Sequence, residues 1–179
     1  MFEGEAMESA DVVRQLRSGA LDNIKAAVEG AQADGAPRLV VIDVISPADA
    51  APFLTAVAAE FTAHSVTATD PSLGGEVLTL LALPQPVPPG AVIVVDRAHL
   101  ADATSLSHLH RLLVETDEPL VIVLAKDPTD ELGSMAIERL ATTTGRTLTR
   151  ISLDPLDAGT LRELITGPST DRFIDALTD

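Results

Sequence analysis

Three continuous runs of aliphatic residues place the strongest constraint on what this chain can fold into. They are Arg38 to Ile45, Ala91 to Val95 and Pro119 to Ala125, and each is followed by a segment with helical spacing of its apolar residues. Runs that are apolar throughout, rather than alternating, indicate strands buried on both faces of a sheet. Strands that alternate with helices indicate parallel pairing through right-handed crossovers. The sequence therefore predicts a mostly parallel sheet between two layers of helices.

The remaining segments extend this pattern. A further strand is expected at Arg146 to Leu153 and a short one at His64 to Thr69, giving a sheet of about five strands. Helical spacing predicts helices at 11–33, with an interruption at Ser18-Gly19, at 47–63, 104–115, 131–142, 158–165 and 171–177, and a short helix at 76–83. We expect an α/β fold with three αβα layers in a single domain over 11–179, with a sheet core at about 38–153, C-terminal helices at 158–179 and a flexible segment at 1–10.

Composition and charge narrow the function classes. The chain has 179 residues with 27 acidic and 12 basic side chains, a net charge of −15. A field of this sign repels nucleic-acid phosphates and anionic membranes, so we expect neither direct nucleic-acid binding nor membrane association. Cysteine is absent, which excludes disulfides and zinc–cysteine sites. An acidic N-terminus and the lack of a long apolar run predict a cytoplasmic protein.

Asp96 is the first candidate site residue, because it ends a buried run. The apolar residues Val92 to Val95 lead directly into this acid. An acid at the end of a Walker B strand holds Mg²⁺ or its water shell. For Asp96 alone, a helix cap or a turn acid is the simpler interpretation. His99 and Asp102 could complete a metal trio with Asp96, with a capping network as the alternative.

The segment that continues from Asp96 resembles a known family. It reads Asp96, then Ala98-His99-Leu100-Ala101-Asp102 and a leucine-rich helix, which is similar to the ATPase domains of the STAND branch of the AAA-like NTPases, as in large LuxR-type transcriptional regulators. The resemblance implies a P-loop NTPase-like fold in which Leu120 to Ala125 is the sensor strand. Ile151 to Gly167 looks like the family's exit from the sheet.

The phosphate loop of that family is missing from this chain. Such a loop reads G-x-x-x-x-G-K-[ST], and its backbone N–H groups and lysine hold the phosphates. After the strand that ends near Asp43, this chain has Ser46, Pro47 and Asp49 and no Gly or Lys. Its only lysines, Lys25 and Lys126, are followed by Ala and Asp, so the motif occurs nowhere in the sequence.

Two further residues depart from the family pattern. Arg97 stands where hydrolytic members commonly carry a second acid, and a guanidinium cannot accept a proton from the attacking water. Arg97 could instead pair with Asp96 or Asp102. Lys126 falls near the expected sensor position and could touch an anion, although a solvated lysine at a strand end is the simpler expectation.

We therefore expect a catalytically inactive ATPase-like domain that acts by protein–protein interaction or regulation and needs no cofactor. Its partner would be an unknown protein, and a homodimer is compatible with the sequence. The leucine-rich helix offers a partner surface only if Leu106, Leu109, Leu112 and Leu113 do not all face the core. One alternative is a nucleotide- or phosphate-binding enzyme with an atypical loop, in which Ser46, Asp96 and Lys126 would bind Mg-ATP and Asp96 would hold the metal. Another is a fragment of a larger LuxR-type regulator.

Overall fold

A computed structural model describes residues 17–45, 47–68 and 87–155 of the chain. In this part the elements follow one another as α2 (Ser18–Asp34), β1 (Arg38–Val44), α3 (Pro47–Phe61), β2 (His64–Thr67), β3 (Ala91–Asp96), the 3₁₀ turn η3 (Ala98–Leu100), α4 (Ala103–Glu115), β4 (Leu120–Lys126), α5 (Glu131–Thr143) and β5 (Thr147–Leu153). The predicted segments at 1–10, 76–83, 158–165 and 171–177 lie outside the described residues.

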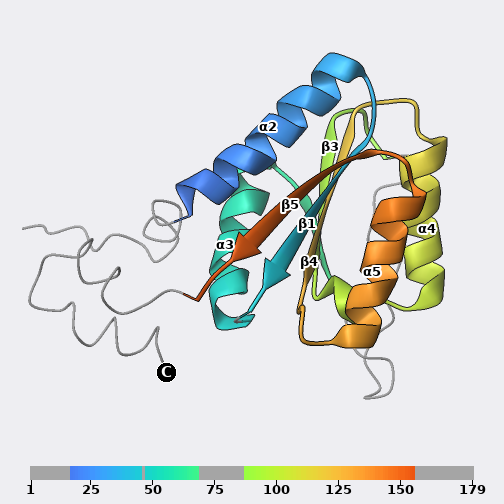
Figure 1. The fold of residues 1–179 in the computed structure, drawn as a ribbon. Helices are drawn as coiled ribbons and strands as arrows, with labels where there is room; N and C mark the ends of the chain where they lie inside the picture. The colour runs from blue at the N-terminus through green and yellow to red at the C-terminus, as the bar shows by residue number, and fades with distance from the viewer. Residues whose placement is uncertain (1–16, 46, 69–86, 156–179) are drawn as a thin grey trace, which may run out of the picture.

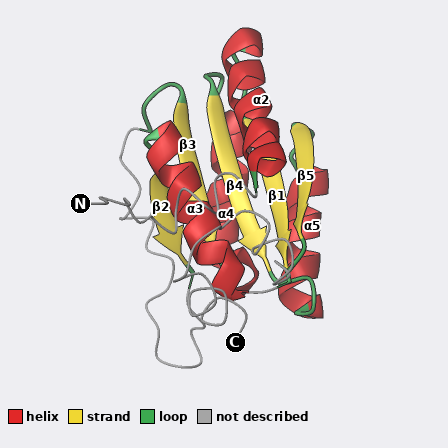
Figure 2. Ribbon diagram, turned by 90° about the vertical axis from the view of Figure 1, so that its left-hand side faces the viewer, coloured by secondary structure: helices red, strands yellow, loops and turns green. Residues whose placement is uncertain are grey.

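The five described strands form one sheet in which every pair is parallel. The order across the sheet is β2-β3-β4-β1-β5, which Figure 2 shows from left to right. The register sets Val40 of β1 opposite Val123 of β4 on one side and Thr149 of β5 on the other. Parallel strands need crossover connections, and α3, α4 and α5 each carry the chain over a face of the sheet from one strand to the next in sequence.

Helices cover both faces of the sheet. α2 and α3 lie on one face, and α4 and α5 lie on the other (Figure 1). Alternate residues of each strand point to opposite faces, so the strands feed two separate cores. In β1, Val40 and Ile42 pack toward α2 and α3, whereas Leu39 and Val41 pack toward α4 and α5. The predicted three-layer α/β fold with a parallel sheet is confirmed.

The helix ends show how local sequence fixes the element boundaries. Asp102 caps α4 by accepting hydrogen bonds from the N–H groups of Thr104, at 2.9 Å, and Ser105, at 3.1 Å. α2 and α3 both end on a residue with a left-handed backbone, Gly35 with φ 63° and Thr62 with φ 50°. Glycine adopts this conformation without strain, and the β-branched Thr62 does not.

No helix in the described ranges is long and apolar enough to cross a membrane.

Candidate functional site

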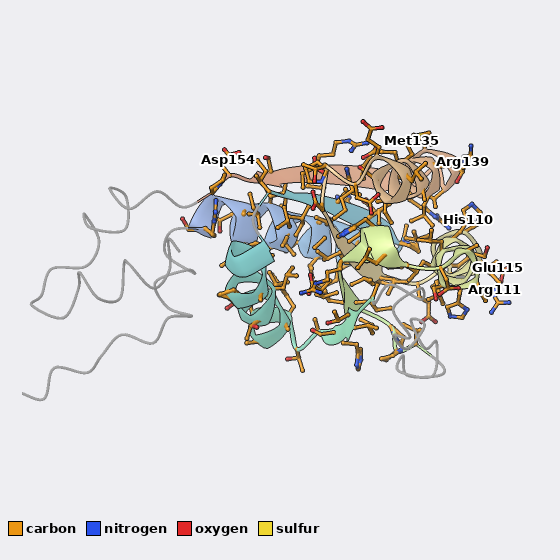
Figure 3. The ribbon with its side chains drawn as sticks, turned by 90° about the horizontal axis from the view of Figure 1, so that it is seen from below. His110, Arg111, Glu115, Met135, Arg139 and Asp154 are labelled. Atoms are coloured by element: carbon orange, nitrogen blue, oxygen red, sulfur yellow. The ribbon has the colours of Figure 1, made fainter. Side chains whose placement is uncertain are left out.

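A small cleft opens at the edge of the sheet where the strands end. Its volume is about 260 Å³, and it is bounded by the ends of β1, β3 and β4 and by the first turn of α3. Ligands of parallel α/β sheets bind at this carboxyl edge. Figure 3 looks onto this edge from below. The residues that line the cleft are Val44, Ala50, Asp96, Arg97, His99, Leu100, Ala125, Lys126 and Asp127.

Asp96 lies in this cleft as the last residue of β3. Its carbonyl oxygen accepts a hydrogen bond of 2.9 Å from the N–H of Ala68, which holds the end of β2 against β3. Val94, two residues earlier, packs toward α2 and α3, so strand alternation places Asp96 on that same side. The structure thus brings Asp96 to the expected edge, and a metal-binding role for it stays a prediction.

Arg97 follows Asp96 with a left-handed backbone, φ 51°, and an exposed side chain. Within the described part of the chain, Arg97 forms no ion pair, and Asp102, one of its two expected partners, serves instead as the N-cap of α4. A non-glycine residue in this backbone region carries strain of about 1 kcal/mol or more. The turn after Asp96 is therefore strained, and it carries an exposed basic residue that lines the cleft.

Lys126 is not the solvated lysine that the sequence suggested. It is the last residue of β4, and only 4% of its surface is exposed. Its Nζ lies 2.8 Å from Oδ1 of Asp43 and 3.4 Å from Oε1 of Glu138, and it donates a hydrogen bond of 2.6 Å to Oγ of Ser134. The contact with Asp43 is ionic, because its angles fall outside those of a hydrogen bond.

The cause of this burial is the strand register. β1 and β4 pair so that Asp43 and Lys126 stand side by side, and both side chains face the layer that contains α5. One turn of α5 then supplies Ser134 and Glu138 above the lysine. Residues from two strands and a helix, distant in sequence, thus enclose the ammonium group.

Arg150 of β5 completes this charge chain. It binds Glu138 through two hydrogen bonds, from Nη1 to Oε1 at 2.8 Å and from Nη2 to Oε2 at 2.5 Å. The hydrogen bond from Arg150 lowers the pKa of Glu138, with smaller contributions from the charges of Arg150 and Lys126. Glu138 is therefore ionised near neutral pH. Two cations and two carboxylates balance, so Lys126 brings no uncompensated positive charge to the cleft.

The other polar groups of the edge are held by local hydrogen bonds. The N–H of Asp127 donates to Nδ1 of His99 at 3.0 Å, and the carboxylate of Asp127 accepts from the N–H and the hydroxyl of Thr129. These bonds from Thr129 lower the pKa of Asp127. In the described residues, no three His, Asp or Glu side chains lie close enough to hold a metal ion, so the trio of Asp96, His99 and Asp102 is not assembled.

Gly133 brings α5 against this edge. A Cβ atom built on it would lie 2.1 Å from the carbonyl oxygen of His99, so only glycine permits this approach of α5 to η3. The N–H of Gly133 also donates to the N-cap residue Asp130 at 3.1 Å. Ser46, the remaining predicted site residue, lies outside the described residues, and α3 begins directly after it at Pro47.

Sequence reasoning missed the partners of Lys126. Ser134, Glu138 and Arg150 were not singled out, and Asp43 was named only as the residue near which a strand ends. The available signal was an acid and a lysine at the ends of two strands that could be neighbours. Strand order and register were needed to show that Asp43 and Lys126 meet.

Comparison with known proteins gives structural matches only. No protein-family model and no curated protein sequence matches the chain. Two variants of RuvB from Thermotoga maritima, an AAA+ P-loop ATPase, superpose with TM-scores of 0.55 and 0.53, each at 14% identity. They cover 90% and 89% of this chain, which spans 54% and 52% of those chains. At this identity the likeness shows the fold alone, which is that of a P-loop NTPase-like α/β domain.

Proposed function

We propose that this chain is an ATPase-like domain that neither binds nor hydrolyses nucleotide and that acts by contact with another protein in a cytosolic regulatory system. The observation that carries this proposal is that Lys126 is buried and paired with carboxylates. A phosphate loop uses a free lysine to reach the outer phosphates. Here the one lysine at the carboxyl edge is buried between Asp43 and Glu138, and the other, Lys25, belongs to α2.

The region after β1 supports the same proposal. α3 begins at Pro47, which has no N–H to offer a phosphate, and no glycine precedes it in the loop. Asp96 and Asp127 line the cleft with one cation that forms no ion pair in the described residues, Arg97, and this excess of carboxylates disfavours a triphosphate. The volume of about 260 Å³ is also small, because ligand clefts commonly measure about 300–1,000 Å³.

Arg97 supports the absence of hydrolysis. The residue after the Walker B-like acid would have to accept a proton or position water, and a guanidinium has no acceptor. Its side chain is exposed on a strained turn. Arg97 therefore cannot serve as the general base beside Asp96.

The regulatory context rests on the resemblance to STAND-type ATPase domains of LuxR-type regulators. A net charge of −15 favours a protein partner over nucleic acid, because nucleic-acid binding requires basic surface. The partner would be another protein or a second copy of this chain, and the chain would serve either alone or as part of a larger regulator.

A second candidate function is the binding of a small anion with Mg²⁺. The N-terminus of α3 opens toward the cleft, since Ala50 in its first turn is one of the lining residues. The N–H groups at a helix N-terminus attract anions. In this alternative, Ser46 and the first turn of α3 would hold a phosphate, Asp96 would hold the metal, and Lys126 would have to leave Asp43.

Calorimetric titration with ATP, ADP and inorganic phosphate, each with and without Mg²⁺, tests both candidates. We expect no binding heat at millimolar ligand and no rise in melting temperature. A ligand at about 100 times its Kd would stabilise the fold by about 2.7 kcal/mol, which a thermal scan would detect readily.

Matched variants identify the site if binding does occur. Mg²⁺-dependent binding that disappears in Asp96→Asn but persists in Asp22→Asn, an exposed acid of α2, would replace our proposal with the second candidate. If both variants still show binding heat with ATP, the proposal that the chain binds no nucleotide is refuted, and the nucleotide binds elsewhere on the domain.

A further inference from the structure

A groove runs between α4 and α5, and it shares no lining residue with the cleft. Its volume is about 560 Å³, and Leu106 of α4 forms part of its wall together with Leu132, Met135 and Leu140 of α5. Leu132 and Met135 are 82% and 64% exposed. Apolar side chains that gather on a surface in this way commonly mark a contact site.

The inner faces of the two helices already supply the core. Leu109 and Leu113 of α4 and Ile137 and Leu140 of α5 are buried against the sheet. The other leucines of α4, Leu106 and Leu112, are partly buried and pack against this core, and Leu106 also lines the groove. All four leucines of the helix thus contact the core, and α4 contributes to the groove through the part of Leu106 that stays open, with Ala103, Ser107 and His110 beside it.

The spacing of the lining residues suits a helical ligand. On α5 the groove is lined at positions 132, 135, 136, 139, 140 and 143, and on α4 at 103, 106, 107 and 110. Both sets follow the i, i+3, i+4, i+7 stripe of an α-helix. Two such stripes side by side form a trough into which a third helix can place its apolar side chains. Met135 adds a flexible side chain that adapts to different partners.

The charge of the groove is opposite to that of the chain as a whole. The chain carries 27 acids against 12 basic residues, yet the lining contains Arg139 and His110 and no acid. Arg139 is exposed and forms no ion pair within the part of the chain that the structure describes. Figure 3 shows Met135 and Arg139 on α5 and His110 on the neighbouring α4. An acidic ligand would meet an unpaired guanidinium here.

We propose that this groove docks an acidic amphipathic helix of a partner protein. The partner would insert apolar side chains at i, i+3, i+4 and i+7 between Leu106, Leu132 and Met135, and its flanking carboxylates would face Arg139 and His110. A second copy of the chain is the alternative occupant, and the test below distinguishes it from a separate partner. This inference rests on one part of the proposed function, which is that the chain acts by contact with another protein.

The test uses a synthetic amphipathic helix of about 18 residues with leucines at helical spacing and glutamates along its flanks. A matched peptide carries lysines in place of the glutamates. Binding is measured by fluorescence anisotropy on a labelled peptide, and amide NMR shifts locate it on the protein. We expect the acidic peptide to bind at least about tenfold more tightly than the basic one, with shifts confined to α4 and α5.

Charge-reversal variants then examine the groove itself. Arg139→Glu should weaken binding of the acidic peptide by about tenfold or more. Arg111→Glu should have little effect, because Arg111 is an exposed arginine of α4 that lies outside the groove lining and pairs with Glu115. Met135→Asp, a second groove variant, replaces an apolar side chain by a charged one and should also weaken binding of the acidic peptide. Unchanged thermal melts show that these variants fold.

Three results would overturn the inference. They are equal binding of the two peptides, shifts on another face, and self-association of the chain that Met135→Asp abolishes, which would make a second copy the occupant. ATP titrated into the same samples separates the two proposals. If ATP binds and the acidic peptide also binds in the groove, only the proposed function is refuted. If neither ATP nor the peptide binds, only the groove as a docking site is refuted.

Discussion

The substitution Lys126→Met would leave the carboxylate of Asp43 without its cation while it preserves most of the volume of the side chain. Lys126 has 5% of its side chain exposed, and its Nζ lies 2.8 Å from Asp43. Glu138 would keep its two hydrogen bonds from Arg150, so the uncompensated charge would be that of Asp43. The perturbation therefore acts mainly on one ion pair.

The expected cost follows from the burial of that pair. Removing one partner of a fully buried pair costs about 3–5 kcal/mol. The side chain of Asp43 is 34% exposed, and water can solvate part of its charge. We therefore expect Lys126→Met to lower the free energy of unfolding by about 2–3 kcal/mol. Lys126→Met combined with Asp43→Leu replaces the pair by apolar groups and should cost only about 1 kcal/mol or less.

Urea denaturation followed by far-UV circular dichroism measures these differences. The chain has no Trp and no Tyr, so intrinsic fluorescence offers little signal. Wild type, the two single variants and the double variant form a double-mutant cycle. A Lys126→Met variant with the wild-type urea midpoint would show that the lysine is not paired in solution. A double variant that loses the sum of the single losses would refute the coupling.

Three further predictions concern stability. Thr62→Gly should raise the free energy of unfolding by up to about 1 kcal/mol, because relief of a left-handed backbone at φ 50° outweighs the added flexibility of the unfolded chain; a lower urea midpoint would contradict this. Gly133→Ala should lower the free energy of unfolding by about 1–2 kcal/mol, because its Cβ would lie 2.1 Å from the carbonyl oxygen of His99. The control Gly19→Ala in α2, where a Cβ would have nothing within 4 Å, should be neutral or stabilising. Equal effects of the two substitutions would refute the close approach of α5 to His99. The pKa of Glu138 is lowered below its ordinary value of 4.5, so its ionised form stabilises the fold above about pH 4.5, and this contribution is lost as pH falls through the lowered pKa. In Glu138→Gln the free energy of unfolding should therefore fall less steeply as the pH is lowered in the acid range. The same acid dependence in wild type and variant would speak against the ion pair.

The sequence contained most of the architecture, because buried parallel strands are apolar throughout and their ends are marked by polar residues. β3 ends at Asp96 as expected, and α4 begins within one residue of the predicted Thr104. Lys126 was misjudged because its neighbours depend on strand order and register, which local patterns do not specify. A partner surface on α4 could be predicted from the sequence only conditionally, because helical spacing alone cannot tell which leucines of α4 face the sheet.

Strand order also has a consequence for how the chain is made. β1 is the first described strand to be synthesised, yet its two neighbours in the sheet, β4 and β5, are the last. At about 5–20 residues per second, β1 waits roughly 4–16 s on the ribosome before β4 emerges. During this time a strand with Leu39, Val40, Val41 and Ile42 has neither of its hydrogen-bonding partners. The nascent chain therefore displays an unpaired apolar strand throughout this interval, and the strand can aggregate until β4 emerges.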